Sequence, residues 1–209
     1  MLPNPSFHRT LRDEAAQRPV NQTSGLSHYR EAIMNTVWIV DGAYLMKGAP
    51  GRFEYVKLKN ELEKLNGEPF TESFYLNSTP NPATDAQDAF HSWIKMAPPK
   101  GPKMRVQLYK LKDMHCECPS CHTKFDREVQ KGVDVAIATL LIKLAVQKKY
   151  DRVILSAGDG DFESAVEYVK DEFQKEFWVA GFNGSVSADL QSYADNAIWI
   201  DSFWASIQK

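Results

Sequence analysis

Short apolar runs alternate with segments of helical periodicity along most of the chain. Residues 36–40 (TVWIV) form a β-branched and aromatic run that is typical of a buried strand. Similar runs predict strands at 73–76, 104–111, 153–156, 177–180 and 197–200. Apolar positions three or four residues apart predict helices at 56–65, 84–96, 133–146, 162–169 and 188–194. Strands that alternate with helices predict an α/β fold, in which helices cover both faces of a mostly parallel central sheet.

Residues 1–33 differ from the rest of the chain. They are polar, carry prolines at positions 3, 5 and 19, and show no sustained periodicity. This composition predicts a disordered leader at 1–33, followed by one folded domain at 34–209. Met34 stands just before the first predicted strand. We therefore expect that translation, or at least the functional domain, begins near this residue.

Composition narrows the class of protein. The chain is 43% hydrophobic and 25% charged, which is typical of a soluble globular domain. No apolar run approaches the roughly 18 residues of a membrane span, and no secretory signal is evident, so we expect no membrane partner. The net charge of −2 does not indicate nucleic-acid binding, although a local basic patch would suffice. Three cysteines clustered within 116–121 favour a reducing, cytoplasmic location.

Carboxylates follow two of the predicted strands. Asp41 comes directly after the first strand, and Asp159 and Asp161 follow the strand at 153–156 in the sequence SAGDGDF. The carboxyl ends of parallel strands meet at one edge of a sheet, where ligands bind in such folds. Asp134 lies in the first turn of the helix at 133–146, on the flank of its apolar face. We expect all four carboxylates at this edge.

Each aspartate also has an ordinary structural interpretation. Asp41 before a glycine could form a turn, and Asp161 could cap the helix at 162–169. Asp134 could simply be an aspartate in the first turn of a helix, which the helix dipole favours. Their coincidence at one edge instead favours a site for Mg²⁺ or Mn²⁺, which relieves the repulsion between carboxylates. Such an ion activates water for attack on a phosphodiester, without a serine or histidine nucleophile.

Four stretches resemble the NYN domain family, in particular its LabA-like branch, which is related to PIN-domain ribonucleases. They are VWIVDGAYLMKG, KGVDVAIATLLIKLA, YDRVILSAGDGDFESAVEYVKD and VAGFNGSVSADLQSYADNAIWID, in order over residues 36–203. The resemblance implies a PIN-like three-layer α/β/α sandwich with an acidic Mg²⁺ or Mn²⁺ pocket. It also implies endoribonuclease activity, that is, metal-dependent hydrolysis of RNA phosphodiesters.

The resemblance assigns roles at the matching positions. Asp41, Asp134, Asp159 and Asp161 are the implied metal ligands and catalytic residues, and Ser156 occupies the place of a small hydroxyl residue before the acidic loop.

The chain departs from the family pattern at three places. Tyr44 stands where relatives often carry asparagine, and residues 138–140 (ATL) lack an acid that many relatives carry. The usual SGDGDF reads SAGDGDF here, with an added or substituted alanine. The alternative function is therefore a catalytically weak or inactive RNA- or protein-binding regulatory module with the same fold. Hydrolysis of small nucleotides also stays open.

The sequence HCECPSCH at 115–122 is a second candidate site, and we expect it to be an insertion beside the pocket. Cys118 and Cys121 have the CxxC spacing of a zinc ribbon. Cys116 and either His115 or His122 could complete a structural Zn²⁺ site, for which we select His122. Reduced free thiols and a redox dithiol are the alternatives.

Basic and aromatic residues indicate an RNA partner. Lys47 and Lys131 lie nearest the expected pocket and, with Tyr44 and Ser156, are the predicted substrate-binding residues. A further basic cluster runs through positions 95, 100, 103, 105, 110 and 112, with Tyr109 among them. Lysines exposed on an ordinary surface would explain this cluster equally well. The tryptophans at 178, 199 and 204 are expected in the core or on the surface of a homodimer.

Overall fold

The computed structural model describes residues 34–80, 82–129 and 132–209. The predicted leader at 1–33 and the predicted substrate-binding residue Lys131 lie outside the described residues. No helix within the described ranges has the length and apolar character that crossing a membrane requires.

Six parallel strands form the central sheet. They are β1 (Thr36–Asp41), β2 (Glu72–Thr79), β3 (Arg105–Lys110), β6 (Arg152–Ser156), β7 (Glu176–Gly181) and β8 (Asn196–Trp199), in the order β3-β2-β1-β6-β7-β8. Val37 of β1 pairs with Glu72 on one side and with Val153 on the other. The chain winds outward from β1 in one direction and from β6 in the other. The order of strands therefore reverses between β1 and β6, which is where ligands bind in open α/β sheets.

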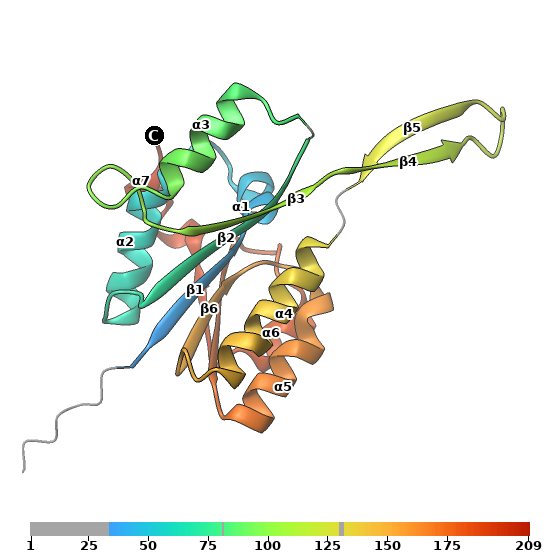
Figure 1. Ribbon diagram of the computed structural model, residues 1–209. Helices are drawn as coiled ribbons and strands as arrows, with labels where there is room; N and C mark the ends of the chain where they lie inside the picture. The colour runs from blue at the N-terminus through green and yellow to red at the C-terminus, as the bar shows by residue number, and fades with distance from the viewer. Residues whose placement is uncertain (1–33, 81, 130–131) are drawn as a thin grey trace, which may run out of the picture. The chain divides into compact units, whose positions relative to one another are not determined.

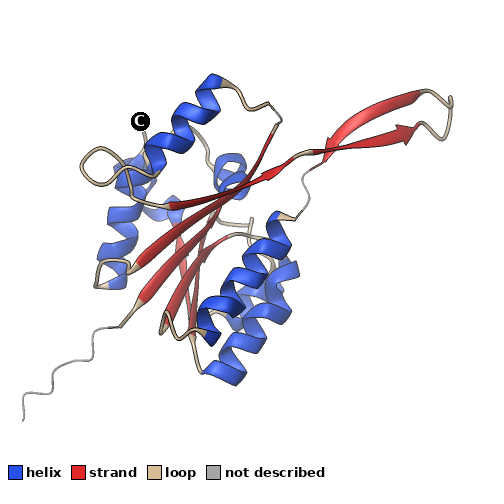
Figure 2. Ribbon diagram, in the orientation of Figure 1, coloured by secondary structure: helices blue, strands red, loops and turns tan. Residues whose placement is uncertain are grey.

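Helices cover both faces of the sheet (Figure 2). They are α1 (Gly42–Gly48), α2 (Tyr55–Asn66), α3 (Asp85–Ile94), α4 (Val133–Val146), α5 (Glu163–Phe173), α6 (Ala188–Tyr193) and α7 (Trp204–Ile207). Val37 and Ile39 belong to a core shared with α4, α5 and α6. Trp38 and Val40 belong to a second core, shared with α1, α2, α3 and α7. This alternation along β1 produces three layers and confirms the predicted α/β/α architecture.

Three tryptophans are expected from the sequence in the core or on a dimer surface. In the structure they are partly buried and pack against the two cores. Trp178 and Trp204 pack against the second core, and Trp199 packs against the first.

A β-hairpin separates β3 from α4 and was not predicted (Figure 1). Its antiparallel strands are β4 (Lys112–Glu117) and β5 (Lys124–Val129), which form a two-stranded sheet of their own. The HCECPSCH sequence therefore occupies the end of β4 and the turn of this hairpin. The helix α1 was also not predicted, because seven residues with glycine at each end show little periodicity.

Candidate active site

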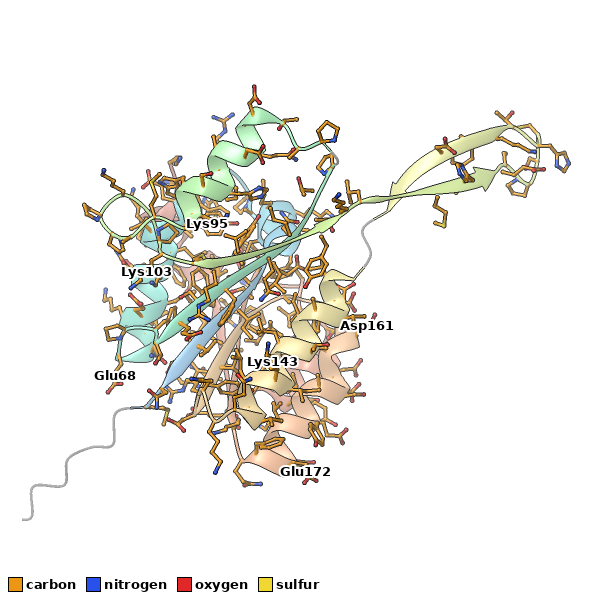
Figure 3. The ribbon with its side chains drawn as sticks, in the orientation of Figure 1. Glu68, Lys95, Lys103, Lys143, Asp161 and Glu172 are labelled. Carbon is orange, nitrogen blue, oxygen red and sulfur yellow. The ribbon has the colours of Figure 1, made fainter. Side chains whose placement is uncertain are left out.

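The acidic residues lie where β1 and β6 end, at the point where the order of strands reverses. Asp41 is the last residue of β1, and Asp159 and Asp161 follow β6 through a short loop. Val40 pairs with Ser156 at the ends of these neighbouring strands, so the two acidic segments begin side by side. Figure 3 shows Asp161 near the N-terminal end of α4, the helix that carries Asp134.

Asp41 joins β1 to α1. Its Oδ1 accepts hydrogen bonds from the backbone N–H groups of Ala43 at 2.9 Å and Tyr44 at 3.2 Å. These bonds satisfy two donors at the helix N-terminus, as an N-cap does. Both bonds use Oδ1, which leaves Oδ2 as the oxygen for a cation or its water. Asp41 is therefore both a cap and a candidate ligand.

The loop after β6 is organised by Asp159. Its Oδ1 accepts a hydrogen bond from the backbone N–H of Asp161 at 3.1 Å and caps the short 3₁₀ helix at Gly160–Phe162. The interpretation of Asp161 as the cap of the following helix is wrong, because α5 begins at Glu163 and has no side-chain cap. Asp159 and Asp161 are both exposed. Their carboxylates remain accessible to solvent and to a ligand.

Asp134 couples electrostatically to the other acids. Although its side chain is exposed, partial burial of the carboxyl raises its pKa, and the charges of Asp159 and Asp161 raise it further. Burial also raises the pKa of Asp41, against two backbone hydrogen bonds that lower it; the charge of Asp134 adds to the rise, and that of Lys47 opposes it. Three chain segments thus place carboxylates close enough to disfavour the ionisation of Asp41 and Asp134.

Neutralising Asp134 is expected to stabilise the protein when no divalent cation is present. Its pKa in the folded state lies above the ordinary value of 3.8, so the ionised carboxyl lowers the free energy of unfolding at neutral pH. We expect Asp134→Asn to raise the melting temperature at pH 7 in EDTA by about 1–3 °C, the scale of a small surface effect. The gain should shrink as the pH approaches 4, where the wild-type carboxyl becomes protonated.

The exposed Glu172, at the far end of α5, provides a matched control for this experiment (Figure 3). The variant Glu172→Gln removes one negative charge outside the acidic cluster and should change the melting temperature little. An unchanged or lower melting temperature for Asp134→Asn would contradict the proposed repulsion.

A fifth acid adjoins this cluster and was missed in the sequence. A Cβ placed on Gly160 would stand 3.6 Å from Oδ2 of Asp189, in the first turn of α6. Asp189 is exposed, and α6 follows β7, the strand next to β6. The rule that placed Asp41 and Asp159 at the carboxyl edge of the sheet also applies to the loop after β7, and it could have identified Asp189.

Tyr44 holds the acidic loop against the loop after β7. Its hydroxyl lies 2.6 Å from Oγ of Ser185 and accepts a hydrogen bond from the backbone N–H of Phe182 at 3.1 Å. Its ring packs on Gly158, where an added Cβ would come within 2.5 Å of Tyr44 Cε2. A Cβ on Gly181 would come within 2.3 Å of the Tyr44 hydroxyl. The sequence predicts that Tyr44 binds substrate. In the structure its hydroxyl and ring contact the loop after β7 and the loop that carries Asp159 and Asp161.

The other predicted substrate-binding residues have different surroundings. Ser156 is fully buried, and its hydroxyl accepts a hydrogen bond from the indole N–H of Trp38 at 2.9 Å. The structure therefore places the Ser156 side chain in the core, out of reach of a substrate. Lys47 is exposed in the last turn of α1, and its charge lowers the pKa of Asp41. It supplies a positive charge at the rim of the acidic cluster.

Part of the basic cluster lies at a different edge of the sheet. Lys95, Lys103 and Arg105 line a groove of about 350 Å³ beside the first residues of β2 and β3. Figure 3 shows Lys95 and Lys103 on the side of the molecule that carries α3. These residues lie where β2 and β3 begin, whereas Asp41 lies where β1 ends, so they do not border the acidic cluster.

The donor chemistry of the acidic cluster suits a hard divalent cation. Within the described ranges, no three His, Cys, Asp or Glu side chains are arranged to hold a metal ion together. Mg²⁺ in proteins is commonly held by one or two carboxylates, with waters and substrate phosphates completing its octahedron. One or two carboxylates are available for this role, from Asp41 through its free Oδ2 and from the exposed Asp134 or Asp159.

The hairpin turn brings two of the predicted zinc ligands together. Thr123 lowers the pKa of the Cys121 thiol to about 7 through side-chain and backbone hydrogen bonds, and the Cys118 side chain contributes through another hydrogen bond. Cys116 instead donates from Sγ to the backbone carbonyl of Met114 at 3.6 Å. The His122 Nδ1 lies 2.8 Å from Oε1 of Glu117. The structure therefore does not gather the four predicted zinc ligands of one chain around a common centre.

Comparisons with known proteins agree with this architecture. The sequence matches the NYN domain family over residues 36–201. The fold is similar to that of a solved protein of unknown function, VPA0982, from Vibrio parahaemolyticus RIMD 2210633, with a TM-score of 0.58 and 21% sequence identity. That similarity covers 80% of this chain and 94% of the other. No curated protein gives a significant match. Because the family match spans most of the chain, including all four predicted acids, the protein belongs to the NYN domain family, within the PIN-like nuclease superfamily.

Proposed function

We propose that the protein is a divalent-metal-dependent endoribonuclease of the LabA-like branch, which hydrolyses RNA phosphodiesters in the cytoplasm. The observation that carries the proposal is the electrostatic coupling of Asp41, Asp134, Asp159 and Asp161 where the order of strands reverses. The sequences KGVDV and SAGDGDF support the assignment to this branch. Three free cysteines support a reducing compartment.

The charges of the site explain why such an enzyme would need a cation. Four clustered carboxylates repel an RNA phosphate, and Lys47 offsets only part of their charge. When bound, Mg²⁺ or Mn²⁺ would supply charge neutralisation and a water of lowered pKa. The chain's own contribution is positional, because the caps made by Asp41 and Asp159 fix the carboxylates on rigid elements.

A binding module without strong catalysis is the second candidate. One observation favours it, namely that the described residues include no group of three His, Cys, Asp or Glu side chains arranged to hold a metal ion. A weakly held cation would leave RNA or protein recognition intact while lowering the rate of hydrolysis. The two candidates share the fold and differ in turnover.

Incubation of the full chain with end-labelled single-stranded RNA tests the proposal. We expect cleavage in Mg²⁺ or Mn²⁺ and none in EDTA, with products resolved on a denaturing gel. Binding of the same RNA without cleavage, in saturating Mn²⁺, would contradict the nuclease proposal and favour the binding module. Cleavage that persists in EDTA would contradict the role of the carboxylates.

A further inference from the structure

The tip of the β4–β5 hairpin carries two free cysteines. Cys118 and Cys121 flank a tight turn, in which the backbone N–H of His122 donates to the Cys118 carbonyl at 2.9 Å. The backbone N–H of Cys118 donates to the Thr123 carbonyl at 3.0 Å and closes the turn. Sγ of Cys121 lies 3.2 Å from Oγ1 of Thr123, and its thiol interacts with that of Cys118. Both thiols are free, and the hydrogen bond between their side chains places them next to each other at the hairpin tip.

The other two predicted ligands face different partners. Cys116 lies within β4, opposite Phe125, and its thiol is bonded to the backbone of its own strand. The His122 imidazole is paired with Glu117. A structural zinc site needs four ligands in a tetrahedron. One hairpin therefore presents two ligands, and the described part of the chain gathers no third one with them.

We propose that two copies of this chain meet at their hairpin tips and share one Zn²⁺, held by Cys118 and Cys121 of each copy. A two-fold axis through the ion would generate the second pair of thiolates from the first, as in closed homodimers. As each Zn–S bond forms, the thiol releases its proton to solvent, so no oxidant or reductant is required.

The hairpin surface suits a second copy of itself. Strand alternation places Met114 and Cys116 on one face of β4, with Phe125 opposite Cys116. Met114 and Phe125 are 41% and 50% exposed, so this apolar face is available for burial. From residue 114 to residue 126 the hairpin has one lysine and two acidic side chains. Two hairpins can therefore approach each other with little net repulsion.

Metal content and molar mass of the full chain test the proposal together. Protein purified with Zn²⁺ and a phosphine reductant should contain about one zinc ion per two chains. Light scattering on a sizing column should give the mass of a dimer, and EDTA should return the monomer. One zinc ion per monomeric chain, or no bound zinc, would overturn the proposal. A dimer that persists in EDTA would also overturn it.

Four variants distinguish the shared site from one completed within a single chain. Cys118→Ser and Cys121→Ser should each lose zinc and the dimer. Cys116→Ser and His122→Ala should keep both, whereas loss of zinc in either would show a single-chain site and overturn the proposal. Because these residues lie on a hairpin outside the main sheet, the melting temperature measured in EDTA should stay unchanged in all four. Co²⁺ substitution should give the charge-transfer absorption of four thiolates, and a two-thiolate spectrum would contradict the shared site.

Discussion

Replacing Asp159 by asparagine is expected to abolish metal-dependent RNA cleavage while leaving the fold intact. Asparagine keeps an Oδ1 that can accept the hydrogen bond from the Asp161 N–H, so the 3₁₀ turn after β6 should persist. The variant loses the negative charge that would attract a cation. Loss of a direct metal ligand removes several kcal/mol of transition-state stabilisation, so we expect the cleavage rate to fall by at least about 100-fold.

The control for Asp159→Asn is Glu172→Gln, which neutralises an exposed acid at the far end of α5. It should cleave RNA at the wild-type rate. Mg²⁺ should also raise the melting temperature of the wild type more than that of Asp159→Asn, because ligand binding to the folded state adds stability. Cleavage that survives in Asp159→Asn would show that the loop after β6 is a turn and cap without a catalytic role.

The sequence predicted the central architecture because the strands and long helices are strongly patterned. Residues 133–146 were expected as a helix with the bounds that α4 has, since its apolar positions recur through four turns. The strand at 36–40 was placed to within one residue. The rule for parallel sheets then places Asp41 and Asp159 at one edge from the sequence alone.

The features that were missed depend on contacts between distant segments or on elements with weak periodicity. Tyr44 and Ser185 form their hydrogen bond across 141 positions of the sequence, and no local pattern indicates that pairing. Ser156 resembles a site residue in the sequence because it precedes the acidic loop. In the structure Ser156 is the last residue of β6, and its hydroxyl accepts a hydrogen bond from the indole N–H of Trp38. The strands of the hairpin are mostly polar, so they lack the apolar alternation that identifies a half-buried strand.

Introducing a single methyl group at Gly158 is expected to disrupt the acidic loop. A Cβ there would lie 2.1 Å from the backbone oxygen of Ser185 and 2.5 Å from Cε2 of Tyr44. Neither neighbour can give way easily, because one is backbone and the other is a ring held by two hydrogen bonds. We expect Gly158→Ala to lower the free energy of unfolding by about 2–3 kcal/mol. The melting temperature should fall by about 5–10 °C.

Gly160→Ala is the matched control, two residues along the same loop. Its Cβ would meet its nearest neighbour, Ser187 Oγ, at 3.4 Å, an ordinary contact. We expect a change within about 0.5 kcal/mol in the free energy of unfolding, measured by urea denaturation.

Gly158→Ala should also affect the position of Asp159, the next residue in the loop. The backbone N–H of Ser187 donates to the Gly158 carbonyl at 2.9 Å, so a shift of Gly158 would disturb the hydrogen bond that holds this loop. RNA cleavage by Gly158→Ala should therefore fall even at temperatures where the variant is folded. Equal stability and equal cleavage in the two variants would show that the packing of Tyr44 on this loop does not position the acidic site.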